Sequence, residues 1–205
     1  PILFLFLSLL LAYACKHDNG TKADQLKKYQ EAFAALSDKQ ATPASSDSII
    51  NAWKRYNADP IVLADTDLNA RTKYSLGKLY ARKNPDSSKV YLQQALELVD
   101  VNKRYLDIKA RVYNGMGNLA NEEALEHQAN YYYNKAAIIV LTDSTVKLKP
   151  AAKVIMLLSA AQSNKSLQQY SLAYKMNIAA LQLMPQLPPN APNQQRVLTQ
   201  LISLV

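Results

Sequence analysis

The side chains that could perform acid–base or metal chemistry are few and scattered in this 205-residue chain. It contains two histidines, His17 and His127, and a single cysteine. His127 ends the pattern Glu122-Glu123-x3-His127, but no second histidine lies one turn away, so we expect a solvated surface histidine and no metal site. One cysteine also excludes an intrachain disulfide framework and a cysteine-based metal site.

Motifs for nucleotide binding and for nucleophilic catalysis are missing as well. The chain has 4 glycines, and it contains no P-loop, no dinucleotide fingerprint and no G-x-S-x-G sequence. We therefore expect no catalytic residue, no metal and no cofactor, and a non-enzymatic role for these residues. The open alternative is the N-terminal region of an enzyme whose catalytic domain follows residue 205.

The single cysteine, Cys15, ends an apolar N-terminal segment. Residues 2–14 are apolar except for Ser8, and the chain turns polar directly after Cys15. A transmembrane helix needs about 20 apolar residues, so this run is too short to span a bilayer. Small residues at the end of an apolar run are typical of a signal-peptide cleavage site.

This segment resembles the signal peptide of bacterial lipoproteins. The resemblance implies cleavage after Ala14 and a diacylglycerol on Cys15, with residues 1–14 as signal peptide and 15–20 as the tether of the lipid anchor. It also implies a membrane-anchored protein of the bacterial envelope that faces the periplasm or the cell surface. Pro1 starts the sequence and no basic residue precedes the apolar run, so we expect the signal to be truncated. An ordinary signal peptide or a longer membrane helix with an incidental Cys15 stays open.

The charge balance permits acidic partners, and the alternative is that lysines and arginines only keep a helical surface soluble. The 24 lysines and arginines exceed the 16 aspartates and glutamates, which gives a net charge of +8. Such a surface suits acidic peptides, anionic lipid or nucleic acid. No run of lysine and arginine exceeds two residues, which argues against a nucleic-acid arm.

The hydrophobic spacing predicts helices nearly throughout. Apolar residues recur at three- and four-residue intervals over 22–37, and a second helix is predicted from Ser46 to a stop at Asn57-Ala-Asp-Pro60, with Trp53 in the core. Residues 21–69 are therefore expected to form an N-terminal helical pair or cap. No stretch alternates in a strand-like way. Residues 187–205 are predicted to begin a further, truncated helix, with Val197, Leu198, Leu201 and Ile202 on one side.

Residues 70–186 repeat a pattern of large and small residues. The small anchors Gly77, Gly117 and Ala161 lie 40 and 44 residues apart, and each is followed 18 or 19 residues later by an alanine. We expect a large and a small residue on each first helix to form a knob and a hole, and a close approach of the second helix. Neither helix can bury its apolar stripe alone, so neighbouring pairs must stack.

The repeated pattern resembles the tetratricopeptide repeat. The clearest unit is Tyr113-x2-Met116-Gly117-x2-Ala120 followed by Ala129-x3-Tyr133-x2-Ala136. The resemblance implies an all-α fold, a right-handed α-solenoid of antiparallel helix pairs, with three repeats over 70–186. In the adjacent tyrosines Tyr131-Tyr132-Tyr133, helical spacing places Tyr133 in the core, and Met156 is expected there too.

Tetratricopeptide repeats bind extended peptides along the first helix of each pair, so the resemblance implies a peptide-binding groove on those helices. The polar residues on that face share positive charge or an amide and would suit a carboxylate or an acidic peptide. They are Arg71, Tyr74, Lys78, Arg82, Arg111, Asn114, Asn118, Asn121, Gln162 and Lys165. The plain alternative is a solvated polar face without a ligand.

The combined expectation is a non-enzymatic scaffold of the cell envelope that binds a protein or an acidic peptide and no nucleic acid. It resembles the periplasm-facing repeat region of membrane-bound signalling regulators, such as sensor histidine kinases and transcription regulators. A nutrient-binding outer-membrane lipoprotein of the SusD-like kind is the alternative, although such proteins favour exposed tryptophan and only Trp53 is present.

Overall fold

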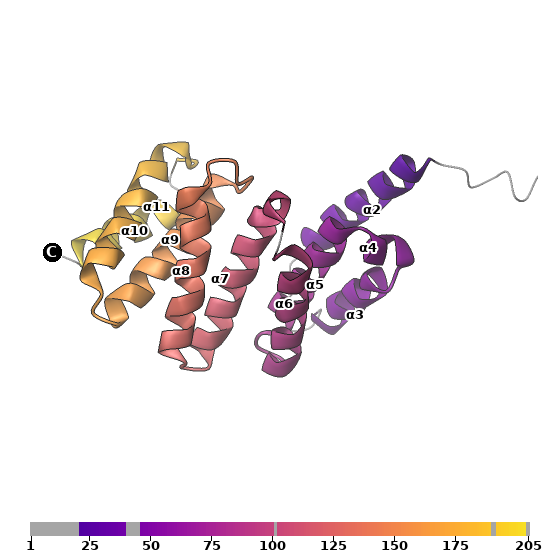
Figure 1. Ribbon diagram of the computed structural model, residues 1–205, viewed down its shortest axis with the longest axis horizontal. Helices are drawn as coiled ribbons and strands as arrows, with labels where there is room; N and C mark the ends of the chain where they lie inside the picture. The colour runs from indigo at the N-terminus through magenta and orange to yellow at the C-terminus, as the bar shows by residue number, and fades with distance from the viewer. Residues whose placement is uncertain (1–20, 40–45, 101, 190–191, 204–205) are drawn as a thin grey trace, which may run out of the picture. The chain divides into compact units, whose positions relative to one another are not determined.

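The computed structural model describes residues 21–39, 46–100, 102–189 and 192–203, and this part of the chain is helical (Figure 1). It forms ten α-helices and two short 3-10 helices, and these residues contain no strand. The all-α prediction is therefore confirmed for the described residues. Cys15 and the rest of the predicted signal segment lie outside them.

The chain divides into two compact units, residues 1–40 and 41–205. Helix α2 (Lys22–Ser37) is the described element of the first unit. It begins with a capping box, in which the Asp24 N–H donates to Thr21 Oγ1 at 3.2 Å and the Thr21 N–H donates to Asp24 Oδ2 at 3.0 Å. These bonds satisfy backbone donors that the first turn of a helix leaves unpaired. The helix lies where the hydrophobic spacing predicts one.

The second unit begins with α3 (Ser46–Asn57), which buries Trp53 as predicted. Helix α3 ends at Asn57, within the segment Asn57-Ala-Asp-Pro60 that was predicted to stop it, and a further short helix, α4 (Pro60–Ala64), begins at Pro60. Asp59 Oδ1 accepts the Ile61 N–H at 2.9 Å, and proline is tolerated in a first helical turn because its missing N–H would be unpaired there. The predicted end of the helix at Asn57-Ala-Asp-Pro60 is therefore confirmed, while α4 was not predicted as a separate helix.

Three helical hairpins follow in chain order, and Figure 1 shows them side by side. They are α5 (Thr66–Tyr80) with α6 (Pro85–Val99), α7 (Leu106–Glu122) with α8 (Glu126–Thr142), and α9 (Pro150–Ser166) with α10 (Tyr170–Leu183). The second helix of each pair packs against the first helix of the next, α6 on α7 and α8 on α9. Helix η1 (Lys103–Tyr105) precedes α7, η2 (Met184–Gln186) follows α10, and α11 (Pro192–Ile202) packs on α9 and α10.

The second and third hairpins share one register. Their turns place Ala124 and Gln168 at φ of 57° and 60°, and these two residues lie 44 positions apart, as the helix starts do. In each turn, the backbone N–H of the next residue donates to a carbonyl of the first helix at 2.8 Å. The Leu125 N–H donates to the Ala120 carbonyl, and the Gln169 N–H donates to the Asn164 carbonyl. Ala120 and Asn164 are therefore equivalent backbone positions.

The predicted anchors do lie where paired helices meet. Gly77 faces Leu92 and Gly117 faces Tyr133, and the alanines Ala95, Ala136 and Ala180 are fully buried. Tyr133 and Met156 are in the core as expected. Close contact at small residues lets the two helix axes approach.

The linker between α8 and α9 carries more structure than the sequence suggests. Val146 and Leu148 are buried in a cluster with Ala110, Ala136 and Met156. The lysines that alternate with them, Lys147 and Lys149, are exposed. Residues 143–149 therefore run over the hairpins as an anchored segment.

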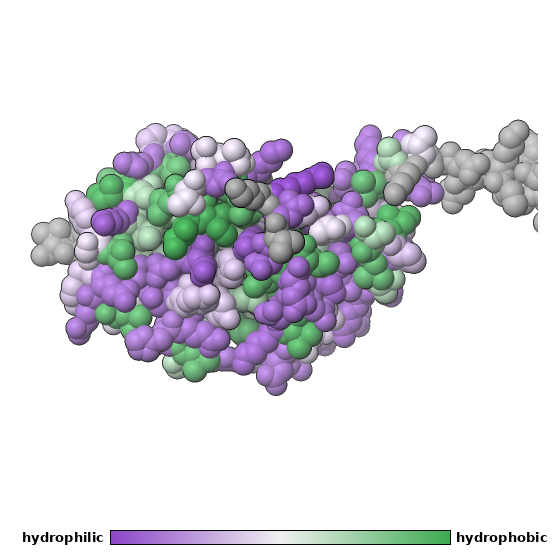
Figure 2. Space-filling model, in the orientation of Figure 1, coloured by the Kyte–Doolittle hydropathy of each residue, from purple (hydrophilic) through white to green (hydrophobic). Residues whose placement is uncertain are grey.

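The C-terminal helix is present as predicted, but not all of its predicted apolar side is buried. Val197 is fully buried, whereas Leu198 is 48% exposed. Adjacent residues of a helix point about 100° apart, so both cannot face the same neighbour. Figure 2 shows a largely hydrophilic surface on this view, with hydrophobic residues gathered over α9 to α11.

Candidate functional site

A basic cleft lies along the first helices of the first two hairpins. It has a volume of about 550 Å³ and is formed by α5, by η1 with the start of α7, and by the segment 143–149. Five cationic side chains line it against two carboxylates, those of Asp67 and Asp107; the cations are Arg71, Arg104, Arg111, Lys147 and Lys149. We call these seven residues the basic cleft. The excess of positive charge makes it complementary to an anionic ligand.

Arg71 bridges the first two hairpins within the cleft. Its Nε lies 2.8 Å from Asp67 Oδ2 on α5, and its Nη2 lies 2.8 Å from Asp107 Oδ2 on α7. The Asp107 side chain is only 11% exposed, so its charge depends on this partner. Arg71 is thus in the predicted groove, but its hydrogen bonds to the two aspartates connect α5 to α7, so its main role is structural.

Tyr74 on α5 lies next to Arg111 of the basic cleft, although its own side chain does not line the cleft. Burial raises the pKa of Tyr74, and the nearby Arg111 guanidinium partly opposes that rise. The Tyr74 ring also packs at Gly115, where an added Cβ would lie 3.4 Å from Cε2. The predicted residues Arg71, Tyr74 and Arg111 are therefore brought together by the packing of α5 on α7.

Lys147 and Lys149 belong to the basic cleft but were missed by the sequence reading. Val146 and Leu148 are buried, and side chains alternate along extended backbone. The lysine that follows each of them therefore points outward, Lys147 after Val146 and Lys149 after Leu148. The alternation Val146-Lys147-Leu148-Lys149 was the available signal. It is too short to stand out in a chain dominated by helical periodicity.

A second recess takes up another part of the predicted groove. It is about 320 Å³ in volume and is lined by Lys78, Arg82 and Asn118 together with Gly77 and Glu122. Two of these groups already have partners. Arg82 Nε lies 3.6 Å from Glu122 Oε1, and Asn118 Oδ1 accepts the Tyr133 O–H at 2.9 Å.

The remaining predicted residues do not join either recess. Asn114 is 8% exposed, so it packs inside the hairpins where a solvated groove residue was expected. Lys165 donates from Nζ to the Ser203 carbonyl at 2.8 Å. Asn121 and Gln162 are exposed on α7 and α9, outside the linings of the two recesses.

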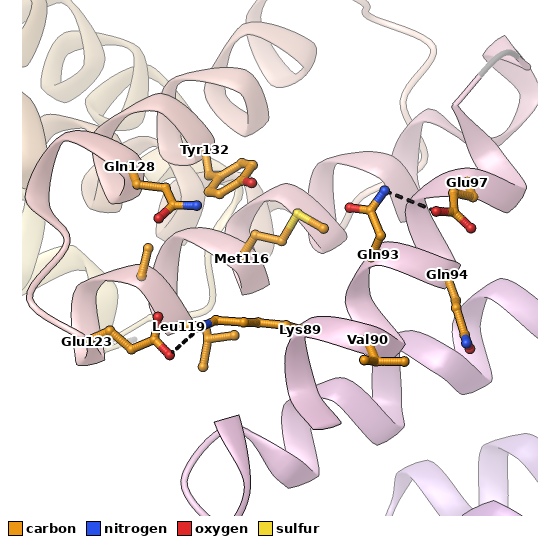
Figure 3. Close-up of a pocket in the computed structure, with 11 residues that line it drawn as sticks. Lys89, Val90, Gln93, Gln94, Glu97, Met116, Leu119, Glu123, Gln128 and Tyr132 are labelled. Carbon is orange, nitrogen blue, oxygen red and sulfur yellow. Dashed lines mark hydrogen bonds and ion pairs between the residues drawn. The ribbon is translucent and has the colours of Figure 1, made fainter. Parts of the chain in front are cut away.

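A separate cavity of about 570 Å³ lies between α6, α7 and α8 (Figure 3). Its apolar lining comes from Val90, Met116, Leu119, Ala120 and Tyr132. Its polar lining comes from Lys89, Gln93, Gln94, Glu97, Glu123 and Gln128. No residue of this inter-hairpin cavity was predicted as a site, because it forms only when two hairpins are packed together.

The described residues form neither a metal-ion site nor a membrane-spanning helix. They contain no group of three or more histidine, cysteine, aspartate or glutamate side chains that could hold a metal ion. None of their helices has both the length and the apolar character needed to cross a bilayer. Comparison with protein-family models and with curated proteins finds no match to this chain.

Proposed function

We propose that this chain is a helical-repeat scaffold that binds an acidic segment of a partner protein in the basic cleft. The observation that carries the proposal is the gathering of five cationic side chains around two carboxylates in a cleft of about 550 Å³. Arginine and lysine form charge-assisted hydrogen bonds with carboxylates, and these are stronger than bonds between neutral groups.

Most cations of the cleft lie outside the salt bridges found among the described residues. Arg71 is committed to Asp67 and Asp107. Lys147 and Lys149 are exposed at the cleft and form none of the salt bridges found among the described residues. We assign them the main role in attracting an acidic peptide, with the half-buried Arg111 beside Tyr74 as a further contact.

A tetratricopeptide-like solenoid is the architecture we propose for the hairpins. Its support is the shared register of the second and third hairpins and the packing of each pair on the next in chain order. In a solenoid, the first helices line one continuous surface, which would extend the cleft to a peptide-length groove.

Anchoring by a lipid on Cys15 is the second part of the proposal, and it would place the scaffold on an envelope membrane. It rests on the apolar run that ends at Cys15. Mass spectrometry of the chain from a bacterial membrane fraction tests it. The expected result is a new N-terminus at Cys15 with a diacylglyceryl mass increase; an unmodified Cys15, or retention of residues 1–14, contradicts it.

Peptide binding is tested by fluorescence anisotropy with a labelled peptide of alternating Glu and Ala. The reversal Lys147→Glu with Lys149→Glu should weaken binding at least about tenfold, equivalent to about 1.4 kcal/mol. The matched control is Lys135→Glu with Lys175→Glu, which makes the same change of charge at exposed residues on α8 and α10.

Three further outcomes decide the proposal. A peptide of alternating Gln and Ala should not bind, and raising the salt concentration should weaken binding of the acidic peptide because exposed charges are screened. Equal affinity for both double variants would show that net charge alone attracts the peptide, and the basic cleft would then lose its role.

A further inference from the structure

The inter-hairpin cavity occupies a junction that is closed in the next pair of hairpins. There, Asn130 and Asn134 on α8 interlock with Asn164 on α9. Asn130 Nδ2 donates to Asn164 Oδ1 at 2.8 Å, and Asn134 and Asn164 exchange two bonds of 3.0 Å. Asn164 is fully buried in this contact. The junction between the second and third hairpins is thus filled by three amides.

At the first junction, the residue equivalent to the central asparagine is Ala120. The shared turn geometry establishes this equivalence, since Ala120 and Asn164 accept the closing N–H of their turns at the same distance. Lys89 follows the buried Ser88 on α6, as Asn130 follows the buried Ala129 on α8. An alanine therefore stands where an interlocking amide would be, and the junction opens into a cavity of about 570 Å³.

Each charged group that lines the cavity already has a partner there. Figure 3 shows Lys89 joined to Glu123 and Gln93 joined to Glu97. Lys89 Nζ lies 2.8 Å from Glu123 Oε1, and Gln93 Nε2 donates to Glu97 Oε1 at 3.2 Å. An anionic ligand would meet the two glutamates without a free cation among the lining residues. A neutral ligand is the better match, because it displaces none of these pairs.

The uncharged lining includes an aromatic ring that its neighbours fix in place, Tyr132, and a side-chain amide that can bind a ligand, Gln128. Tyr132 stacks on Tyr113 at 6.3 Å between ring centroids and meets Tyr131 edge-on at 5.3 Å, so its ring is braced from two sides. Met116 supplies a polarizable thioether, which packs well on aromatic rings. The side-chain amide of Gln128 forms no hydrogen bond within the part of the chain that the structure describes, and it can both donate and accept.

We propose that the inter-hairpin cavity binds a small neutral molecule that carries one aromatic ring and an amide-like polar group. The ring packs between Met116 and Tyr132, and the polar group bonds to Gln128 at the rim. A volume of about 570 Å³ falls within the range of about 300–1,000 Å³ that small-molecule sites occupy. This site shares no lining residue with the basic cleft, so the two binding proposals are independent of each other.

The test uses the full chain labelled with ¹³C at its methionine methyl groups. The chain has 4 methionines, of which Met116 lines the cavity while Met156, Met176 and Met184 do not. The probe is N-acetyltryptophanamide, and its matched control is N-acetyltryptophan, which differs by a carboxylate in place of the amide. The neutral probe should shift the Met116 methyl signal upfield in a saturable way and leave the other three in place. The anionic control should bind at least about fivefold more weakly.

Two variants locate the binding. Ala120→Asn copies the side chain that the chain itself carries at the equivalent position of the next junction, and it should abolish the Met116 shift while the other methionine signals keep their wild-type positions. Gln128→Ala, at an exposed residue, should weaken binding about fivefold through loss of one hydrogen bond, and it serves if the first variant does not fold.

Three results would overturn the proposal. One is a Met116 signal that does not move when the probe is present at about 20 mM, a concentration at which even a weak ligand with a Kd in the millimolar range would occupy the site. Another is wild-type binding by both Ala120→Asn and Gln128→Ala. The third is a capped pentapeptide with a central tryptophan that binds more than about tenfold tighter than the free amide, which would make the occupant a peptide side chain.

Discussion

The ring of Tyr133 occupies the space directly over Gly117: a Cβ added at Gly117 would lie 2.6 Å from Tyr133 Cδ1. The first hairpin repeats this relationship with a different large residue, since a Cβ at Gly77 would lie 2.7 Å from Leu92 Cγ. In the third hairpin, the equivalent positions hold Ala161 and the smaller Asn177, both buried. Where the first helix gains a methyl group, the second helix carries a smaller side chain.

Gly117→Ala should therefore destabilise the protein by about 1–3 kcal/mol, the usual cost of forcing an extra carbon into a packed core. The better helix propensity of alanine offsets part of this loss. Urea unfolding followed by circular dichroism measures the effect. Gly115→Ala on the same helix is the matched control, because its added Cβ would lie no closer than 3.3 Å to a neighbour and should cost less.

A rescue experiment separates overpacking from any other effect of the methyl group. Adding Tyr133→Asn to Gly117→Ala places at these two positions the residue types that the third hairpin carries there, Ala161 and Asn177. The two changes should be non-additive, with Gly117→Ala costing clearly less in the Tyr133→Asn background. Additive costs would mean that the contact with Tyr133 is not what makes a glycine necessary.

The same tyrosine predicts a loss of stability at high pH. Burial raises the pKa of Tyr133 to about 12, and the Glu122 carboxylate adds to the rise. An unfolded tyrosine titrates near pH 10, so the folded state holds a proton that the unfolded state has lost. The stability that this retained proton gives the folded state is complete below about pH 10 and is lost as the pH rises toward 12. Urea unfolding at a series of pH values should show this fall.

Tyr133→Phe isolates this contribution from the other tyrosines and the lysines. The variant loses the hydrogen bond from the Tyr133 hydroxyl to Asn118 Oδ1, so it should be less stable than the wild type at pH 8. The difference between the two proteins should shrink from pH 10 to 12. A constant difference across that range would contradict the raised pKa.

The hairpins could be predicted from the sequence because their information is local. Glycine and alanine at fixed intervals fix which residues of a helix pair face each other, and the observed partners of Gly77 and Gly117 follow that register. Tyr133 reaches the core for the same reason. Periodicity within one helix thus determines the contacts inside one hairpin.

Contacts between hairpins could not be predicted in this way. The inter-hairpin cavity depends on Ala120 lying where Asn164 lies in the next repeat, which becomes visible only once the turns are aligned in space. Lys147 and Lys149 reach the basic cleft because Val146 and Leu148 are buried among residues of the second and third hairpins. Asn114 is buried as well, although its polar side chain and its place on the predicted groove face favoured exposure.

The bridge from Arg71 predicts a specific sensitivity at the basic cleft. Arg71→Ala leaves the mostly buried Asp107 carboxylate without its partner and should cost about 1–3 kcal/mol of unfolding free energy, between the values for surface and buried ion pairs. Arg82→Ala is the matched control, since that arginine is 91% exposed and 3.6 Å from Glu122, and should leave stability nearly unchanged. Thermal melts compare the two. Equal effects would mean that Arg71 does not hold the hairpins together.

The interlocked asparagines give the last prediction. Asn164→Ala removes the acceptor shared by Asn130 and Asn134, and Asn130 is itself buried. A buried donor without a partner costs about 1–3 kcal/mol, so the variant should be destabilised by at least that amount. Asn121→Ala, at an exposed position on α7, should change stability by less than about 0.5 kcal/mol.

Hydrogen exchange tells whether this loss is confined to the junction. In Asn164→Ala, the amides of α8, α9 and α10 should exchange faster relative to those of α5 and α6, because the third hairpin loses its polar lock on the second. A uniform acceleration over all three hairpins would show that they unfold together and that the asparagines stabilise the whole array. If neither the exchange pattern nor the stability changes, the apolar contacts around the asparagines stabilise this junction without help from the buried amides.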